Sequence, residues 1–342
     1  MEISTLDADT KNSAPALVDK YRRTITYLRL SITDRCDLRC TYCMPERMKF
    51  LPRSDLMTFE EMLGLSDAFI ARGIDKIRIT GGEPLVRRGA IDFLTALGTR
   101  LGEGLNELTL TTNGTMLEAN AGALYDAGVR RINVSLDTRS PELFQRLTRR
   151  DKLADVLTGL EAAKRAGLQV KINTVALRGL NDVEIPSLIE WAHGEGFALT
   201  LIEAMPLGEI DEDRSDHYLP LDAVRDSLRA RWTLEPLGKT TGGPARYVRV
   251  AETGGELGFI TPLTQNFCAG CNRIRVTATG RLYPCLGGGE HVDLRDAWRT
   301  GGKVAIGDAL DEAMRVKPER HHFAIAPGSA PAQPRHMSMT GG

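Results

Sequence analysis

The chain has no cysteine outside two short groups, and neither group has a fourth member. Its six cysteines among 342 residues form the triplets Cys36-x3-Cys40-x2-Cys43 and Cys268-x2-Cys271-x13-Cys285. Thiols at such close spacing indicate a metal site or catalysis rather than disulfides. Three thiolates can hold a [4Fe–4S] cluster through three irons and leave the fourth iron open to another ligand. The sequence therefore allows two clusters, each with an open iron.

The chain also has little net charge and no long apolar run. Its 44 basic and 45 acidic residues give a net charge of −1, so no overall field draws in nucleic acid or an anionic membrane. No stretch approaches the roughly 20 apolar residues of a membrane span, and residues 1–20 are polar and predict a flexible tail. Without a G-x4-G-K-S/T loop, individual arginines and lysines would have to bind an anionic ligand. We expect a cytoplasmic protein without nucleic-acid or membrane partners.

Short apolar, β-branched runs alternate with helical patterns along the first two thirds of the chain. They cover residues 27–32, 76–80, 107–112, 131–135, 169–175 and 198–204. Thr58 with Glu61 has the pattern of a capping box, and Asn181 with Glu184 resembles another. This βα repeat predicts an α/β fold in which residues 21–206 form a partial (β/α)6 TIM-type barrel.

Past residue 205 the repeat stops. Expected strands at 246–251 and 257–260, with helices near 221–230 and 304–315, predict a smaller α+β module. We assign residues 207–317 to this cluster-binding module, and residues 318–342 to a tail without regular structure that ends in Gly341-Gly342.

Polar residues and small motifs follow most of the expected barrel strands. The first triplet follows the first strand and Gly81-Gly82-Glu83-Pro84 the second, while Thr111, Ser135 and Met205 end later strands. Lys171 lies early in the fifth strand and fits less neatly. Because the carboxyl ends of barrel strands form the active-site face, we expect these residues to converge.

The first triplet could be a structural zinc site. Zinc is usually held by four ligands, and no fourth cysteine or histidine lies near this triplet. A zinc-stabilised binding module is therefore the weaker reading. The spacing and Tyr42 resemble the signature of the radical S-adenosylmethionine (SAM) superfamily, in which SAM binds the open iron.

Two further motifs agree with this superfamily. The Gly81-Gly82 pair could be only a tight turn, but it could also expose backbone hydrogen-bonding groups to a ligand. Glu83 would then accept from the ammonium group of SAM. At the end of the fourth strand, Ser135 could reach its methionyl part.

The second triplet is followed closely by Arg273-Ile274-Arg275. A strand there would put both arginines on one face. Arginines at this spacing are common on solvated strands, yet beside an open iron they would suit a triphosphate, which arginine can bind bidentately. Arg29, Arg78 and Lys171 lie on three expected barrel strands, where cations are hard to explain as core.

Seven segments together resemble the GTP 3′,8-cyclase (MoaA) family of molybdenum-cofactor biosynthesis, from about residue 22 to the end. They are SITDRCDLRCTYCMP, KIRITGGEPLVR, TTNG, NVSLD, IEAMPLG, CxxCNRIRVTATGRLYPCL and the terminal Gly-Gly. The resemblance implies a first [4Fe–4S] cluster on Cys36, Cys40 and Cys43 and a second on Cys268, Cys271 and Cys285. It implies SAM contacts from Tyr42, Gly82, Glu83, Ser135 and Met205. It implies GTP contacts from Arg29, Arg78, Thr111, Lys171, Arg273, Ile274 and Arg275, with catalytic roles for Arg273, Arg275, Gly341 and Gly342 in one chamber.

The implied reaction begins with reductive cleavage of SAM to a 5′-deoxyadenosyl radical. This radical removes the C3′ hydrogen of GTP, C3′ bonds to guanine C8, and reduction gives 3′,8-cyclo-7,8-dihydro-GTP. The resemblance also implies an external electron donor and transfer of the product to cyclic pyranopterin monophosphate synthase, and it is compatible with a homodimer. The alternative enzyme is a peptide-modifying radical SAM protein with an auxiliary cluster, although such proteins typically have more cysteines in the C-terminal module.

Overall fold

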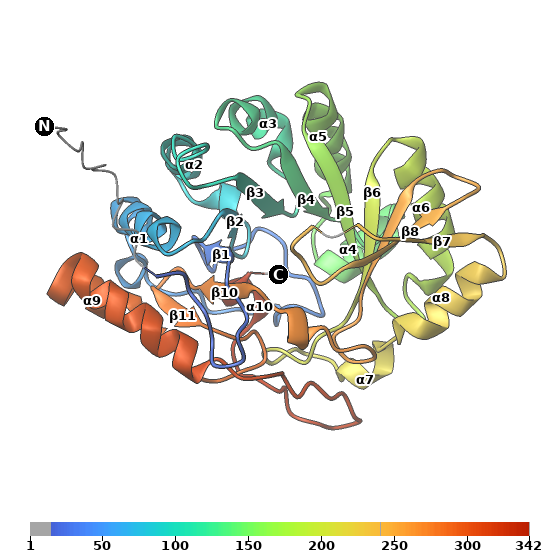
Figure 1. Cartoon of the computed structure of the whole chain (residues 1–342). Helices are drawn as coiled ribbons and strands as arrows, with labels where there is room; N and C mark the ends of the chain where they lie inside the picture. Colours follow the sequence, from blue (N-terminus) through green and yellow to red (C-terminus); the bar gives the residue numbers. More distant parts are fainter. Residues whose placement is uncertain (1–14, 240, 342) are drawn as a thin grey trace, which may run out of the picture.

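The computed structural model describes residues 15–239 and 241–341. In this part of the chain one twelve-stranded sheet has the order β12-β11-β10-β1-β2-β3-β4-β5-β6-β9-β8-β7 (Figure 1). The strands are β1 (Tyr27–Ser31), β2 (Lys76–Thr80), β3 (Glu107–Thr112), β4 (Arg131–Ser135), β5 (Gln169–Ala176), β6 (Ala198–Glu203), β7 (Leu234–Leu237), β8 (Arg246–Val250), β9 (Glu256–Ile260), β10 (Arg273–Val276), β11 (Arg281–Tyr283) and β12 (Val292–Asp293).

Helices cover the outer face of the curved sheet in Figure 1. They include α1 (Phe59–Ala71), α2 (Ala90–Gly98), α3 (Leu117–Asp126), α5 (Leu153–Arg165) and α6 (Ile185–Gly194). The short helix α4 (Pro141–Thr148) lies beside the loop of the first triplet, where Arg39 N donates to Thr148 O. The later helices are α7 (Arg214–His217), α8 (Leu221–Arg229), α9 (Leu294–Val316) and α10 (Met337–Thr340). The capping box of α1 is confirmed, because Thr58 Oγ1 accepts from Glu61 N and Thr58 N donates to the Glu61 carboxylate.

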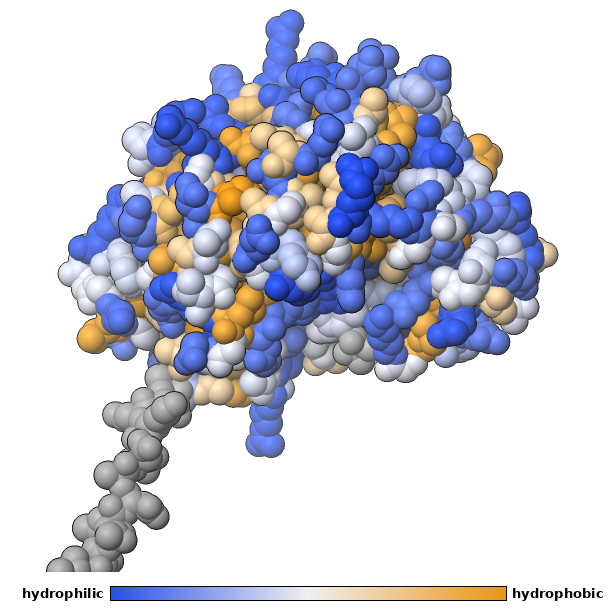
Figure 2. Space-filling model, turned by 90° about the horizontal axis from the view of Figure 1, so that it is seen from above, coloured by the Kyte–Doolittle hydropathy of each residue, from blue (hydrophilic) through white to orange (hydrophobic). Residues whose placement is uncertain are grey.

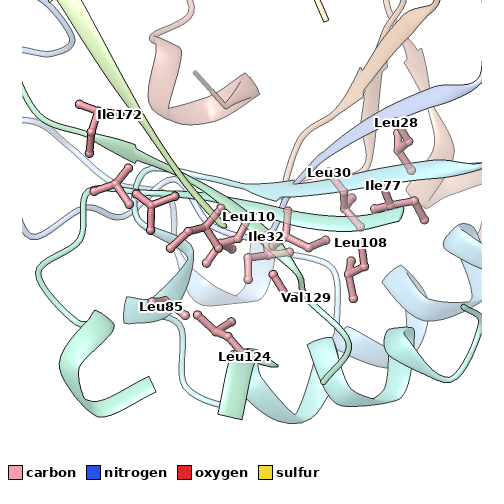
Figure 3. Close-up of a cluster of buried hydrophobic side chains, with 14 of the residues drawn as sticks. Leu28, Leu30, Ile32, Ile77, Leu85, Leu108, Leu110, Leu124, Val129 and Ile172 are labelled. Atoms are coloured by element: carbon pink, nitrogen blue, oxygen red, sulfur yellow. The ribbon is translucent and has the colours of Figure 1, made fainter. Parts of the chain in front are cut away.

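Strands β1 to β6 pair in chain order and run parallel. Each of the six expected strands is present, so the prediction of a partial (β/α)6 barrel is confirmed. Alternation along β1 turns Leu28 and Leu30 toward the helices, where they are almost fully buried with Ile77, Leu108 and Leu110 (Figure 3). The same alternation turns Arg29 to the opposite face of the sheet.

The C-terminal segment extends the barrel sheet at both edges. Strand β9 pairs parallel with β6, and β10 pairs parallel with β1. This pairing places Arg275 opposite Arg29, which in turn lies opposite Arg78 on β2. The segment from residue 207 onward therefore shares the barrel's sheet and brings its own arginines into the barrel's register.

The ends of the described chain are more closely packed than the sequence indicates. The prediction of a flexible tail over residues 1–20 falls largely on residues 1–14, outside the described residues. Leu17, however, is fully buried, and its N–H donates to Arg72 O. Near the other end, α10 lies inside the curve of the sheet and contacts β1 (Figure 1). The tail thus contains a helical turn that the sequence did not predict.

The outer surface is mixed in polarity. Seen from above in Figure 2, hydrophilic residues cover much of the face, and hydrophobic residues lie in small groups among them. Within residues 15–239 and 241–341, none of the helices has both the length and the apolar composition needed to cross a bilayer.

Candidate active site

Two neighbouring cavities lie inside the curve of the sheet. The first has a volume of about 170 Å³, and its lining includes Cys36, Cys40 and Cys43. The second has a volume of about 130 Å³, and its lining includes Cys268, Cys271 and Cys285. The residues that line both are Asn173, Ile202 and Met205. The two triplets therefore face adjoining parts of one chamber.

Most residues expected to contact SAM line the first cavity, namely Tyr42, Gly82, Ser135 and Met205. The Tyr42 hydroxyl donates to Asp137 Oδ2 at 2.6 Å, and Asp137 Oδ1 accepts from Val175 N at 2.8 Å. Burial raises the pKa of Asp137 to about 6, although the hydrogen bond from Tyr42 opposes this rise. Asp137 thus fixes Tyr42 against β5. The sequence analysis did not single out Asp137, although it lies in the same NVSLD segment as Ser135.

The Gly81-Gly82-Glu83 turn packs against the loop that precedes the first triplet. Gly82 N donates to Thr33 O at 2.9 Å, and Glu83 N donates to Arg35 O at 2.8 Å. A Cβ atom on Gly82 would lie 2.3 Å from Arg35 O, so only glycine permits this approach. For the Gly82 N–H group the prediction of exposure to a ligand is wrong, because this group is used within the protein.

Glu83 supports the site from outside the cavities. Its carboxylate accepts from Thr112 Oγ1 at 2.9 Å, from Asn113 N at 2.6 Å and from Leu85 N at 3.0 Å. Burial raises the pKa of Glu83 to about 7 against these hydrogen bonds. Glu83 is not among the described residues that line either cavity. The expected direct contact with the SAM ammonium group is therefore corrected: this side chain holds the turn after β3.

The thiols of the first triplet lie in a buried and partly acidic environment. Burial raises the pKa of Cys36 and of Cys40, and it raises the pKa of Cys43 to about 11. The carboxylate of Glu83 raises the pKa of Cys36 further. The Asn113 amide, which the sequence analysis did not single out, donates to Cys36 Sγ at 3.7 Å. Without a positive centre these thiols would stay protonated.

Five cationic side chains line the second cavity, and its described lining contains no carboxylate. They are Arg29, Arg78, Lys171, Arg273 and Arg275. Arg275, Arg29 and Arg78 occupy matching register positions on three neighbouring strands, so their side chains share one face of the sheet. The chain therefore brings together every cation that the sequence analysis singled out.

Burial and mutual repulsion weaken the protonation of this group. Burial lowers the pKa of Arg29 to about 10 and that of Lys171 to about 7, and neighbouring cations lower both further. Burial likewise lowers the pKa of Arg275. A bound polyanion would oppose each of these shifts by favouring the charged forms. The arrangement is therefore suited to a multiply charged anion.

Two tyrosines that the sequence analysis missed orient these cations. Tyr27 accepts from Arg78 Nε, and Lys171 Nζ donates to the Tyr247 hydroxyl at 3.0 Å. Burial alone would raise the pKa of Tyr27, but Arg78 and Arg29 outweigh it and lower this pKa to about 8. Tyr27 lies two residues before Arg29, so strand alternation could have identified it. Tyr247 comes from β8 and had no such signal.

Lys171 lies deeper in the barrel than the residues at the strand ends. Near the start of β5, it lines the second cavity together with a third hollow of about 720 Å³. Residues at the beginning of β4, β5 and β6 line this hollow as well: Arg131, Gln169 and Ala198. The first cavity occupies the carboxyl ends of the strands, and the cationic cavity extends toward their amino ends.

Two expected GTP contacts lie elsewhere. Thr111 lines the first cavity, and its Oγ1 accepts from Arg78 Nη1 at 3.2 Å. Ile274 is 1% exposed and belongs to the hydrophobic core. Because side chains alternate along β10, Ile274 faces away from Arg273 and Arg275. The side chain of Ile274 therefore does not reach the cavity, and the predicted GTP contact of this residue would have to come from its backbone.

The end of the chain reaches the arginines. Arg275 Nη1 donates to Gly341 O at 2.6 Å and to Thr340 O at 3.3 Å. Gly341 has φ +74°, and a Cβ atom there would lie 2.0 Å from Thr80 Oγ1. Both the conformation and the space require glycine. The predicted approach of the tail holds for Gly341, whereas Gly342 lies outside the described residues.

The donor sets fit two clusters of the [4Fe–4S] type. All six cysteines are free, and each cavity is lined by one complete triplet. Within the described part of the chain, no three Cys, His, Asp or Glu side chains are placed to hold a metal ion. In a [4Fe–4S] cluster each of the three thiolates binds a different iron, so the sulfur atoms lie farther apart than the ligands of a single metal ion do. The open space beside each triplet is where the additional ligand would bind.

Comparisons with known proteins agree with this geometry. A model of the radical SAM superfamily matches residues 30–192, and a model described as Molybdenum Cofactor Synthesis C matches residues 197–323. The chain is 66% identical over 331 residues to the GTP 3′,8-cyclase of Erythrobacter litoralis (strain HTCC2594), covering 96% of this chain and 100% of that protein. It is 53% identical over 348 residues to the GTP 3′,8-cyclase of Rhizobium etli (strain CIAT 652), covering 99% and 100%.

Solved structures share the fold. Streptococcus suis SuiB bound to S-adenosylmethionine has a TM-score of 0.62 and 15% identity, covering 87% of this chain and 69% of that chain. SuiB bound to the precursor peptide SuiA has a TM-score of 0.61 and 16% identity, covering 87% and 68%. At this identity the likeness concerns the fold alone.

The packing of Gly82 predicts a specific defect. Replacing Gly82 by Ala places a methyl group against Arg35 O and should displace the loop that carries the first triplet. Iron and sulfide analysis after anaerobic purification should show a loss of about half of the iron, with the second cluster kept. Gly122→Ala is the matched control, because a Cβ atom there meets nothing within 4 Å and α3 carries none of the six cysteines. Full iron content in Gly82→Ala would contradict the supporting role of this turn.

Proposed function

Because this chain belongs to the GTP 3′,8-cyclase family of radical SAM enzymes, we propose that it converts GTP to (8S)-3′,8-cyclo-7,8-dihydroguanosine 5′-triphosphate. This is the first step of molybdenum-cofactor biosynthesis, and the cofactors are SAM and [4Fe–4S] clusters. The observation that carries the proposal is the lining of the second cavity, which contains five cations and no carboxylate. This cavity adjoins the first one, which is lined by Cys36, Cys40 and Cys43.

We propose that the first cavity binds SAM on the cluster held by Cys36, Cys40 and Cys43. Ser135 and Met205 line the same cavity as this triplet and would contact the methionyl part of SAM. Tyr42, fixed by Asp137, would form part of the wall. When bound, SAM and this cluster supply the 5′-deoxyadenosyl radical that removes the ribose C3′ hydrogen before C3′ bonds to guanine C8.

The triphosphate would lie among the cations of the second cavity. Arg29, Arg78 and Arg275 offer guanidinium groups in one row, which suits bidentate contacts with successive phosphates. Lys171 would bind deeper, near the beginning of β5. With the phosphates held there, the nucleoside would extend toward the second triplet and the shared lining residues Asn173 and Met205. Fixing the substrate in this way places the ribose for reaction and limits side reactions.

Arg273 and Arg275 would differ in their roles. Arg273 Nη2 donates to Cys271 Sγ at 3.8 Å and lies over the Phe267 ring, so it adjoins the second cluster. Arg275 is held by the carbonyl of Gly341, so the diglycine end would position it toward the substrate. We also propose that residues 21–206 form the SAM-binding barrel and residues 207–317 the module of the second cluster, because each of these segments contains one complete triplet.

The partners of the reaction are also proposals. The chemistry needs an external electron donor, and the product would pass to cyclic pyranopterin monophosphate synthase. Six free cysteines are compatible with the reducing cytoplasm. A homodimer remains a further proposal.

Isotope transfer tests the proposed reaction. Reduced protein with SAM and 3′-deuterated GTP should form 5′-deoxyadenosine that contains deuterium, because the radical takes the hydrogen from C3′. Mass spectrometry of 5′-deoxyadenosine measures the transfer, and 2′-deuterated GTP is the matched control. Deuterium that stays in the nucleotide would contradict abstraction at C3′. Two zinc ions per chain and no sulfide would instead favour the zinc-stabilised module.

The low pKa of Lys171, about 7, predicts pH-dependent GTP binding. A triphosphate favours the ammonium form, so the bound pKa lies above the free one. Affinity should be greatest below pH 7 and should fall, by up to about tenfold per pH unit, as the pH rises from the free to the bound pKa. Titration calorimetry between pH 6 and 9 measures this. Lys171→Arg is the control, because arginine stays charged over this pH range and any pH dependence that remains comes from the titration of GTP itself. An identical pH profile in both proteins would refute the role of Lys171.

A further inference from the structure

A lysine with no part in the proposed reaction lies buried beside the second triplet. Lys317 follows the end of α9 and is only 1% exposed. Its Nζ donates to Pro284 O at 2.6 Å, to Arg273 O at 2.9 Å and to Cys271 Sγ at 3.8 Å. A long cationic side chain is rarely buried so completely without a specific interaction. Here one of its partners is a sulfur that would hold the cluster.

The three acceptors define the charge of this group. An ammonium group has three N–H donors, whereas a neutral amine has two donors and a lone pair. Three acceptors therefore match the ammonium form. The acidic group near it, Asp19, is already ion-paired with Arg23 at 2.5 Å. The charge of Lys317 thus acts mainly on the cysteine sulfurs.

Buried cations also contact the other two cysteines of this triplet. Arg23 Nη1 donates to Cys268 O at 2.9 Å. Arg335 Nη2 donates to Cys285 O at 3.3 Å and lies over the Tyr283 ring. Arg23 comes from before β1, and Arg335 comes from the tail. Segments far apart in the sequence therefore place a cationic side chain at each cysteine, and of these Arg23 is balanced by Asp19.

Around the first triplet carboxylates act on two of the sulfurs, but cations are present as well: Arg39 Nη1 donates to Cys36 O, and Arg214 opposes the rise that burial causes in the pKa of Cys43. One hydrogen bond to a sulfur of this triplet comes from the neutral amide of Asn113, which donates to Cys36 Sγ. The carboxylates of Glu83 and Asp37 act on Cys36, and that of Asp137 acts on Cys40. Nearby charge and hydrogen bonds to sulfur help set the reduction potential of an iron–sulfur cluster. Cations stabilise the reduced, more negative state, and carboxylates destabilise it.

We propose that the buried cations around the second triplet, and Lys317 above all, position its cysteines and raise the reduction potential of the second cluster. This inference rests on the proposed function, because it requires a cluster at Cys268, Cys271 and Cys285. It assigns Lys317 as a positioning residue that acts through Cys271. The ammonium group transfers no proton, and only the energy of adding one electron to the cluster changes.

Redox titration followed by electron paramagnetic resonance tests the proposal. Full-length protein with Cys36, Cys40 and Cys43 replaced by Ala isolates the second cluster. In this background, Lys317→Met should retain its iron and sulfide. The ratio of reduced to oxidised cluster at a fixed potential should fall about tenfold, which corresponds to a midpoint about 59 mV more negative.

Two lysine variants serve as controls. Lys317→Arg keeps the charge and should restore the midpoint. Lys303→Met makes the same substitution at an exposed position of α9, the helix that precedes Lys317, and should leave the midpoint unchanged. An equal midpoint in Lys317→Met and Lys303→Met would overturn the proposal.

Loss of the cluster can also be interpreted. If Lys317→Met loses the second cluster and Lys317→Arg keeps it at the original midpoint, the charge at this position is confirmed. If both lose it, Arg335→Gln decides: a more negative midpoint supports the cationic effect, and an unchanged one overturns it. If the protein with Cys36, Cys40 and Cys43 replaced by Ala contains no iron, the presence of the second cluster is refuted. If the wild-type protein transfers deuterium but the midpoint does not change in the variants, only this inference is refuted and the proposed function stands.

Discussion

Five cationic side chains share one cavity, and the fold holds them there against their mutual repulsion. Strand alternation and parallel pairing leave Arg29, Arg78 and Arg275 no other face, because the opposite face carries the leucines and isoleucines that pack under the helices. Burial of that apolar layer stabilises the barrel and so keeps the cations together. The lowered pKa of Lys171 reflects both this burial and its neighbours. A bound polyanion would relieve this repulsion by favouring the charged forms.

The two ends of the chamber differ in charge as the proposed chemistry requires. Around Cys36 the described charges include the carboxylates of Glu83 and Asp37, while around Cys271 they are the cations Lys317 and Arg273. Burial raises the pKa of Cys271, but these two cations outweigh it and lower it to about 7. One end thus suits a ligand that carries a positive sulfonium and ammonium, and the other suits a triphosphate.

Sequence reasoning recovered what depends on local pattern. The six strands, the capping box at Thr58, both triplets and the cations on alternating strand positions all follow from periodicity and spacing. It failed where contacts are long-range. The second expected cap is wrong, because Asn181 bonds to Leu177 N and Asp137 O instead. The edge pairing of β9 and β10 and the approach of Lys317 to Cys271 join segments far apart, so no local pattern could indicate them.

The proposed binding of a triphosphate in the second cavity is tested by comparing ligands with different numbers of phosphates. Calorimetry on the reduced, cluster-loaded protein would compare GTP, GDP, GMP and guanosine at one pH and salt concentration. Because each phosphate contacts further cations, affinity should fall stepwise from GTP to guanosine. The total decrease should be about tenfold or more, since tenfold corresponds to roughly 1.4 kcal/mol, the contribution of one hydrogen bond between charged groups. Equal affinity for GTP and guanosine would contradict the proposed binding.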